Sequence, residues 1–219
     1  MNIAAIGTQE QTEELRKVLS PEHSFQAYES NKIFQINITP YDVVFDLEYD
    51  QRPEEEYYYT TVSGKTIFLS SAKIQLEEYI KIKHSNTLIG INALPTFLGR
   101  KKLEACSPFG PMPVELIKKL GWDDVMETGS RTGMVSPRIV CMIINEAYYT
   151  LQEGTATKED IDKGMKLGTA YPFGPFEWCE KIGIRNVYEV LNAVWEDTRD
   201  ERYRICSLLK TSYLKSLRK

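Results

Sequence analysis

Residues 136–152 read SPRIVCMIINEAYYTLQ, a run that is apolar on nearly every helical face. A helix that is apolar all round lies buried in a core or in an interface. Ser136 suits the N-cap, Pro137 suits the first helical position, and Gly154 ends the pattern. The stretch therefore predicts a buried helix over 137–152.

Helical periodicity continues from this stretch to the end of the chain. Thr157 and Asp160 have the spacing of a capping box, which predicts a helix up to Leu167. The further segments with helical spacing are 175–182, 187–196 and 202–217. We expect a boundary near 131–136, and hence a domain over 1–130 followed by an all-α domain over 131–219.

Before this boundary, short apolar runs alternate with helical patterns. The strand-like segments are 2–7, 23–30, 41–47, 65–69, 87–91 and 123–128, and the helical ones are 8–19, 74–80 and 114–120. Such alternation predicts βαβ units and a mostly parallel sheet, so the first domain is of the α/β class.

Composition limits the classes of function. The 219 residues include 27 Lys and Arg against 31 Asp and Glu, and this mildly acidic balance argues against a nucleic-acid partner. No apolar run reaches the ~18 residues that span a bilayer, and the first residues lack signal-peptide features, so we expect no membrane association. The four cysteines make no CxxC pair, which indicates free buried thiols and a cytoplasmic protein; they are Cys106, Cys141, Cys179 and Cys206.

A series of motifs after residue 132 carries a family resemblance. In order they are Gly133–Arg138, Ile144–Ala147, Lys158–Asp162, Met165–Gly168 and Tyr171–Glu177. This ordered series resembles the C-terminal domain of 3-hydroxyacyl-CoA dehydrogenases, including 3-hydroxybutyryl-CoA dehydrogenases. The resemblance implies an all-α dimerisation domain, and hence a homodimer formed through the C-terminal helices.

The first half resembles the same family less closely. Asp42–Leu47, Lys65–Ser71 and Leu88–Ile91 resemble strands of the family's Rossmann-like, NAD-binding domain, whose long helical insert is missing between Ser30 and Asp42. The resemblance implies a shortened Rossmann-like domain, and an enzyme of fatty acid metabolism. Its nominal reaction is the NAD-dependent oxidation of a 3-hydroxyacyl-CoA to a 3-oxoacyl-CoA.

The expected cofactor-binding residues are Gly7, Thr8, Gln9 and Glu29. A dinucleotide fingerprint needs three glycines, but only Gly7 is kept, and Gln9 and Thr12 replace the others. Gln9 would place a side chain where the phosphates approach. Glu29 lies where a ribose-binding acid would fall, and it also suits a solvated surface. The cofactor is thus NAD by resemblance, or none.

The expected reaction-centre residues are Asn92, Glu104, Ser136 and Ser71. The resemblance places a catalytic His at position 92 and its orienting Glu twelve residues later, where Glu104 stands. Asn92 cannot serve as a base near neutral pH, although it can hydrogen-bond Glu104. The pair is either a structural remnant or part of altered ligand binding. Ser136 matches the family's substrate-contacting Asn or caps a helix, and Ser71 contacts a substrate hydroxyl or stabilises a turn.

The remaining polar features have two interpretations each. His23 and His84 are expected at the surface. The basic run 100–102 either attracts a CoA phosphate or is a solvated face, and the tyrosines of 54–59 suggest an edge or partner surface.

Two hypotheses stay open. In one, the chain is a dehydrogenase whose activity is impaired or lost. In the other, it is a non-catalytic homodimeric scaffold or an acyl-CoA-binding relative.

Overall fold

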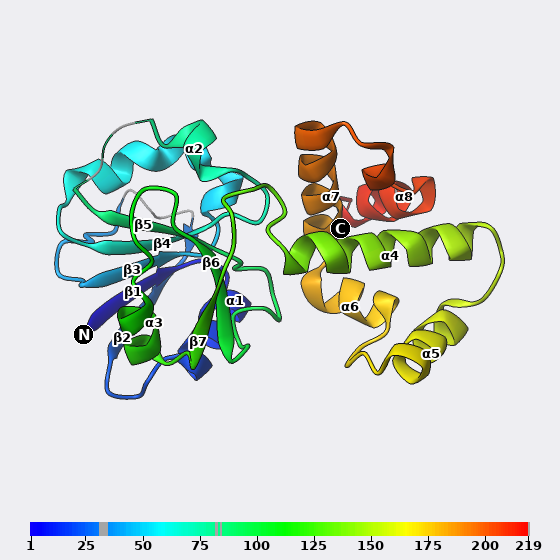
Figure 1. Cartoon of the computed structure of the whole chain (residues 1–219), viewed down its shortest axis with the longest axis horizontal. Helices are drawn as coiled ribbons and strands as arrows, with labels where there is room; N and C mark the ends of the chain where they lie inside the picture. Colours follow the sequence, from blue (N-terminus) through cyan, green and yellow to red (C-terminus); the bar gives the residue numbers. More distant parts are fainter. Residues whose placement is uncertain (31–34, 82, 84, 219) are drawn as a thin grey trace. The chain divides into compact units, whose positions relative to one another are not determined.

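The computed structural model describes residues 1–30, 35–81, 83 and 85–218. The chain divides into two compact units, Met1–Met134 and Val135–Lys219, which we describe separately (Figure 1).

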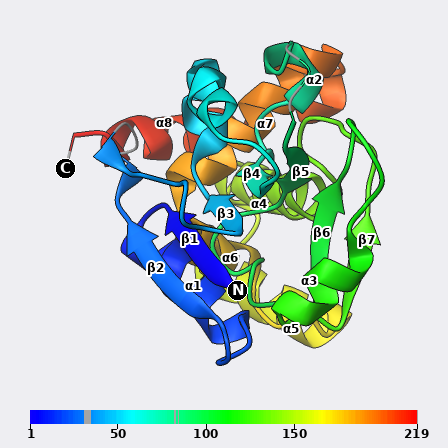
Figure 2. The same cartoon turned by 90° about the vertical axis from the view of Figure 1, so that its left-hand side faces the viewer.

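The first unit is built on a seven-stranded sheet in the order β2-β1-β3-β4-β5-β6-β7. Its strands are β1 Asn2–Ile6, β2 Ser24–Tyr28, β3 Val43–Asp46, β4 Thr66–Ser70, β5 Thr87–Ile91, β6 Lys102–Cys106 and β7 Asp124–Glu127. Figure 2 shows β2 and β7 at the two edges. Every pair is parallel except β5 with β6, which confirms the predicted Rossmann-like α/β class.

The sheet is covered on both faces. The helices are α1 Gln9–Val18, α2 Leu76–Tyr79 and α3 Val114–Leu120, with 3-10 segments η2 Tyr49–Gln51 and η3 Pro53–Thr61. Figure 1 shows α1 and α3 on one side of the sheet and α2 on the other. Alternate strand residues feed two cores, because successive side chains of a strand point to opposite faces. Ile3 and Phe45 pack with Leu15 of α1, whereas Ala4 and Val44 pack with Tyr59 of η3.

Two elements of this unit differ from the sequence prediction. The helix expected over 74–80 is limited to the single turn 76–79. Strand β6 was not predicted, because Lys102 and Glu104 interrupt its apolar pattern. Glu104 is nevertheless buried, with its side chain hydrogen-bonded to Asn92.

Two of the three tyrosines of segment 54–59 lie in the core, so the prediction of an edge or partner surface is wrong for these two. Tyr58 and Tyr59 are buried, and only Tyr57 is exposed. The hydroxyl of Tyr59 donates to Asp46 Oδ2 at 2.5 Å, and Arg52 Nη2 lies 2.5 Å from Asp46 Oδ1. Burial raises the pKa of the Asp46 carboxyl, while Arg52 opposes that shift. The network fixes η3 against the end of β3.

The second unit is all α, as predicted. Its elements are α4 Ser136–Gln152, α5 Lys158–Thr169, α6 Pro175–Ile182, α7 Ile184–Thr198, the 3-10 turn η4 Glu201–Tyr203, and α8 Ser207–Ser216. Helix α4 packs against α6, α7 and α8. The helix expected over 202–217 is divided into η4 and α8. Ile139 on α4 is 55% exposed, so one face of α4 is not covered within this unit.

Polar side chains inside this unit satisfy the ends of neighbouring helices. Asn145 of α4 donates to Arg204 O at 2.9 Å and accepts from Cys206 N at 2.9 Å, just before α8. Asp162 of α5 accepts from Phe176 N at 2.8 Å and Glu177 N at 3.1 Å, at the start of α6. Backbone groups at helix ends have no intrahelical partner, so these side-chain bonds replace the hydrogen bonds to water that burial removes.

The histidine and cysteine predictions have different outcomes. All four cysteines are free and buried, as predicted. His23 is 4% exposed and donates from Nε2 to Lys119 O at 2.9 Å, so its predicted surface position is wrong. His84 lies outside the described residues. Within the described ranges, no helix is long and apolar enough to cross a membrane, and no group of three metal-ligating side chains occurs.

Candidate functional site

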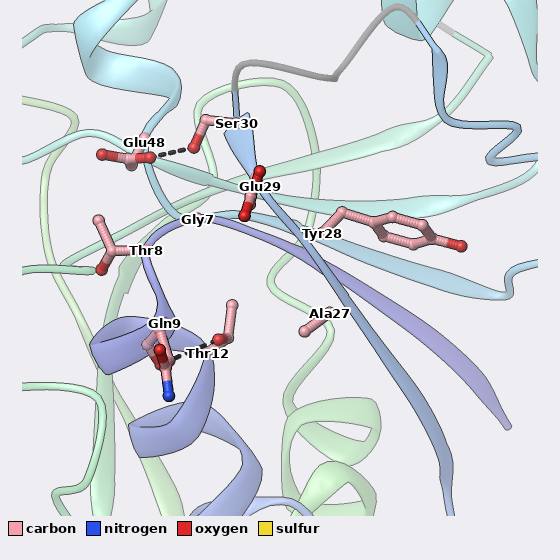
Figure 3. Close-up of a pocket in the computed structure, with 9 residues that line it drawn as sticks. All are labelled: Gly7, Thr8, Gln9, Thr12, Ala27, Tyr28, Glu29, Ser30 and Glu48. Atoms are coloured by element: carbon pink, nitrogen blue, oxygen red, sulfur yellow. Dashed lines mark hydrogen bonds between the residues drawn. The ribbon is translucent and has the colours of Figure 1, made fainter.

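A pocket of about 540 Å³ opens at the carboxyl ends of β1, β2 and β3 (Figure 3). Its described lining residues are Gly7, Thr8, Gln9, Thr12, Ala27, Tyr28, Glu29, Ser30 and Glu48. In parallel α/β sheets, ligands bind outside the carboxyl ends of the strands. The four predicted cofactor-binding residues therefore meet in one pocket, at the position where such folds hold a ligand.

The turn after β1 is closed by hydrogen bonds within the chain. Thr8 caps α1, because its Oγ1 accepts from Gln11 N at 3.3 Å. In return, Gln11 Oε1 accepts from Thr8 N at 3.1 Å and from Thr8 Oγ1 at 3.0 Å. A Cβ at Gly7 would lie 3.0 Å from Leu47 Cβ, so the close approach of the next loop favours glycine there.

Gln11 also connects three loops at this edge of the sheet. Its Nε2 donates to Leu47 O after β3 at 2.9 Å and to Ala93 O after β5 at 3.0 Å. The side-chain amide thus uses both of its donors and its oxygen, and the residue is 7% exposed. The loops after β1, β3 and β5 are held together by one side chain.

The other pocket residues are largely acidic or hydroxylic. Ser30 donates to Glu48 Oε2, and Gln51 Nε2 donates to Glu48 Oε1 at 3.1 Å. In Figure 3, Ser30 and Glu48 lie on the side of the Gly7–Thr8 turn opposite α1, and Glu29 lies beside Ser30. Gln9 lines the pocket, but its amide is directed along α1 and donates to Glu13 at 2.7 Å.

The predicted reaction-centre pair is buried, with Asn92 directly after β5 and Glu104 in the middle of β6. Asn92 Nδ2 donates to Glu104 Oε2 at 3.0 Å, and Asn92 N donates to Glu104 O at 3.1 Å. Asn92 is 1% and Glu104 is 5% exposed. The predicted hydrogen bond is therefore present, and it joins an amide that cannot take up a proton to a carboxyl group that can.

Ser71 lies beside this pair, since its backbone N donates to Ile91 O at 3.0 Å. Its side chain is buried and faces the sheet: a Cβ on Gly90 would meet Ser71 Oγ and Cys106 Sγ, each at 2.6 Å. Burial raises the pKa of the Cys106 thiol, and hydrogen bonds to Ser130 and Ser71 oppose the shift.

Ser136 belongs to the second unit, where it is the first residue of α4. Val135 occupies the N-cap position without a side-chain cap, so the predicted N-cap role of Ser136 is wrong. The basic run 100–102 is exposed in the first unit. Lys102 forms an ion pair with Asp124 at 3.0 Å, and the Arg100 guanidinium lies over the Phe97 ring at 4.1 Å from its centroid.

Sequence reasoning missed Gln11 and Glu48. Thr8 and Gln11 have the spacing of a capping box, so the sequence carried a signal for the first bond. Nothing in the local sequence pairs Gln11 with Leu47 or Ala93, which are distant in the chain. Glu48 is brought to the pocket by the order of the strands.

The comparisons with known proteins agree on the second unit. Residues 133–217 match the family model "3-hydroxyacyl-CoA dehydrogenase, C-terminal domain". A 3-hydroxyadipyl-CoA dehydrogenase of Escherichia coli is 42% identical over 86 residues, which are 39% of this chain and 18% of that protein. A 3-hydroxybutyryl-CoA dehydrogenase of Bradyrhizobium diazoefficiens is 38% identical over 95 residues, 43% of this chain and 32% of that protein. The matches thus span a third or less of these relatives.

Solved structures extend the likeness to the whole chain at the level of the fold. The (S)-3-hydroxybutyryl-CoA dehydrogenase of Ralstonia eutropha has a TM-score of 0.71 and 18% identity, over 98% of this chain and 94% of that one. FadB2 of M. tuberculosis has a TM-score of 0.72 and 12% identity, over 98% and 93%. At such identities the likeness concerns the fold alone.

Proposed function

We propose that the chain binds an acyl-CoA-type molecule without oxidising it, from the premise that residues 133–217 match the 3-hydroxyacyl-CoA dehydrogenase C-terminal domain. The expected ligand class comes from the relatives, whose names describe CoA thioesters. The expected loss of oxidation comes from this chain's own residues.

The Asn92–Glu104 pair carries the proposal. Oxidation of a hydroxyl requires a group that accepts its proton, and such a group must be ionisable near the working pH. The amide of Asn92 is not ionisable, and it donates to the Glu104 carboxylate at 3.0 Å. The geometry supports a pair that preserves local structure where the family resemblance expects a base and its orienting carboxylate.

The pocket at the start of α1 fits a dinucleotide poorly. Two backbone N–H groups there, those of Thr8 and Gln11, already donate within the chain. Glu48 adds a carboxylate to the lining. The residues of this pocket therefore do not fit NAD.

The proposal is tested with acetoacetyl-CoA and NADH as probes. We expect isothermal titration to detect binding of the CoA ester to the protein. The NADH absorbance should stay constant when NADH and acetoacetyl-CoA are mixed with the protein. Asn92→His restores the expected base and serves as the matched variant, with Asn92→Gln as its control. NADH consumption by the unaltered protein would refute the proposal, and so would failure of the CoA ester to bind.

A homodimeric scaffold is a second candidate, because several large apolar side chains of the helical unit are exposed. They are Val135, Ile139, Leu167, Leu214 and Leu217. Val135 and Ile139 are four positions apart at the start of α4, so they lie on the same side of that helix. Light scattering during size exclusion tests the dimer, and Ile139→Asp is expected to shift it toward monomer. A monomer at all concentrations would exclude this candidate.

We also place the protein in the cytoplasm. The four free, buried thiols support this proposal, because disulfides persist in oxidising compartments and are rare in the cytosol. Fractionation of cells that express the tagged chain tests it.

A further inference from the structure

We propose that the pocket at the start of α1 takes a neutral or cationic ligand with hydrogen-bond donors, and that Gln11 and Glu48 exclude molecules with a diphosphate. The pocket lining includes neither Asn92 nor Glu104, so the proposal is separate from that on acyl-CoA binding.

The first step concerns the backbone N–H groups at the turn. A dinucleotide pyrophosphate binds at the N-terminus of the helix after the first strand, where free N–H groups point at it. Here Thr8 N donates to Gln11 Oε1 at 3.1 Å, and Gln11 N donates to Thr8 Oγ1 at 3.3 Å. Two N–H groups of the turn are thus already bonded to its own side chains, so a phosphate that used them would have to break these bonds.

The second step concerns how firmly Gln11 is held. Its Nε2 also donates to Leu47 O and Ala93 O, and the residue is 7% exposed. Moving the side chain aside would leave two carbonyl groups without these bonds, and buried unsatisfied groups are costly. The closed form of the turn is therefore tied to two further loops and does not depend on the capping box alone.

The third step concerns charge. Glu48 accepts hydrogen bonds from Ser30 and Gln51, which are uncharged, so the negative charge of its carboxylate remains at the pocket wall. None of the nine described lining residues is a lysine or an arginine. A diphosphate would face a like charge without a cation from this lining, which is unfavourable at short range.

The same lining suits donors on the ligand. Carboxylate oxygens only accept hydrogen bonds, and the hydroxyls of Thr8 and Ser30 also accept. A volume of about 540 Å³ is within the range of small-molecule sites. Hydroxyl or ammonium groups directed at Glu48 would satisfy this wall, whereas phosphate oxygens would not.

The test compares ADP with adenosine, since the two differ only by the diphosphate. Isothermal titration is carried out on the full chain and on the variants Gln11→Met and Glu48→Gln, with circular dichroism to verify folding. Glu22→Gln is the matched control, because it removes an exposed acid of the same unit outside the pocket lining.

We expect each pocket variant to bind ADP more tightly than the unaltered chain, by about fivefold or more, while adenosine affinity changes little. The Glu22→Gln control should not gain affinity for ADP. Tighter binding of ADP than of adenosine by the unaltered chain would overturn the proposal. The proposal would also be overturned if the folded variants gained no affinity for ADP, or gained affinity equally for ADP and adenosine. If Gln11→Met does not fold, the isosteric Glu48→Gln decides the question.

Discussion

Asp162→Ala is expected to destabilise the helical unit by about 3 kcal/mol, because one carboxylate satisfies two backbone N–H groups of another helix. Asp162 is 9% exposed and accepts from Phe176 N at 2.8 Å and Glu177 N at 3.1 Å. Each bond to a charged group contributes about 1.5–3 kcal/mol, and relaxation around the truncated side chain recovers part of the sum.

The close packing around Asp162 adds a second constraint. A Cβ at Gly174 would lie 2.4 Å from the Asp162 carboxyl carbon, so the side chain has no room to move toward Gly174. Asp162→Asn keeps the shape but loses the charge, and its amide nitrogen would face one of the two backbone N–H donors. We expect it to cost about 1–2 kcal/mol.

Urea unfolding followed by far-ultraviolet circular dichroism measures the free energy of unfolding, and hydrogen exchange reports the two amides directly. Lys163→Ala is the control, because Lys163 is an exposed neighbour on the same helix. It should change stability by less than about 0.5 kcal/mol. The reasoning would be refuted if Asp162→Ala lost no more unfolding free energy than the control and the Phe176 and Glu177 amides stayed protected from hydrogen exchange.

Three further predictions concern other buried groups. Arg52→Met should destabilise the first unit by about 3–5 kcal/mol, since it leaves the Asp46 carboxylate without its cation. Burial already raises the Asp46 pKa, so the stability tied to its protonated form is lost as pH rises; unfolding curves should show a larger deficit near pH 8 than near pH 5. Asn92→Asp places a second carboxylate within about 3 Å of Glu104, and its destabilisation should likewise shrink in acid; a pH-independent deficit would contradict this. Burial raises the pKa of Cys179 to about 11, so iodoacetamide should label it only after unfolding, as mass spectrometry would show.

Most of the fold was predictable because its elements have strong local signals. The apolar runs of β1, β3, β4 and β5 are bounded by polar or turn residues. In the second unit, α4 and α6 have a proline in the first turn, and α5 begins at the cap Thr157. Strand β6 was not predictable in this way. Its Glu104 is buried because Asn92 provides a partner from another strand, and no local pattern reports such a pairing.

The candidate site was predictable where two residues keep a family spacing. Asn92 and Glu104 are twelve positions apart, and the structure joins them by the expected hydrogen bond. Gln11 and Glu48 were missed, because their roles depend on loops that the strand order brings together. His23 was placed wrongly for the same reason: its partner, Lys119 O, is supplied by α3.

The end of α3 also bears on the order in which the first unit folds. Its last carbonyl groups are satisfied by the α1–β2 connection: Ser20 N donates to Leu120 O at 2.8 Å, and His23 bonds Lys119 O across 96 positions of the chain. Contacts between such distant residues form slowly, since a long loop must close first. During synthesis Ser20 and His23 leave the ribosome well before α3 exists. A helix of seven residues is marginal by itself, so we expect α3 to become stable only when it packs against the α1–β2 connection, late in folding.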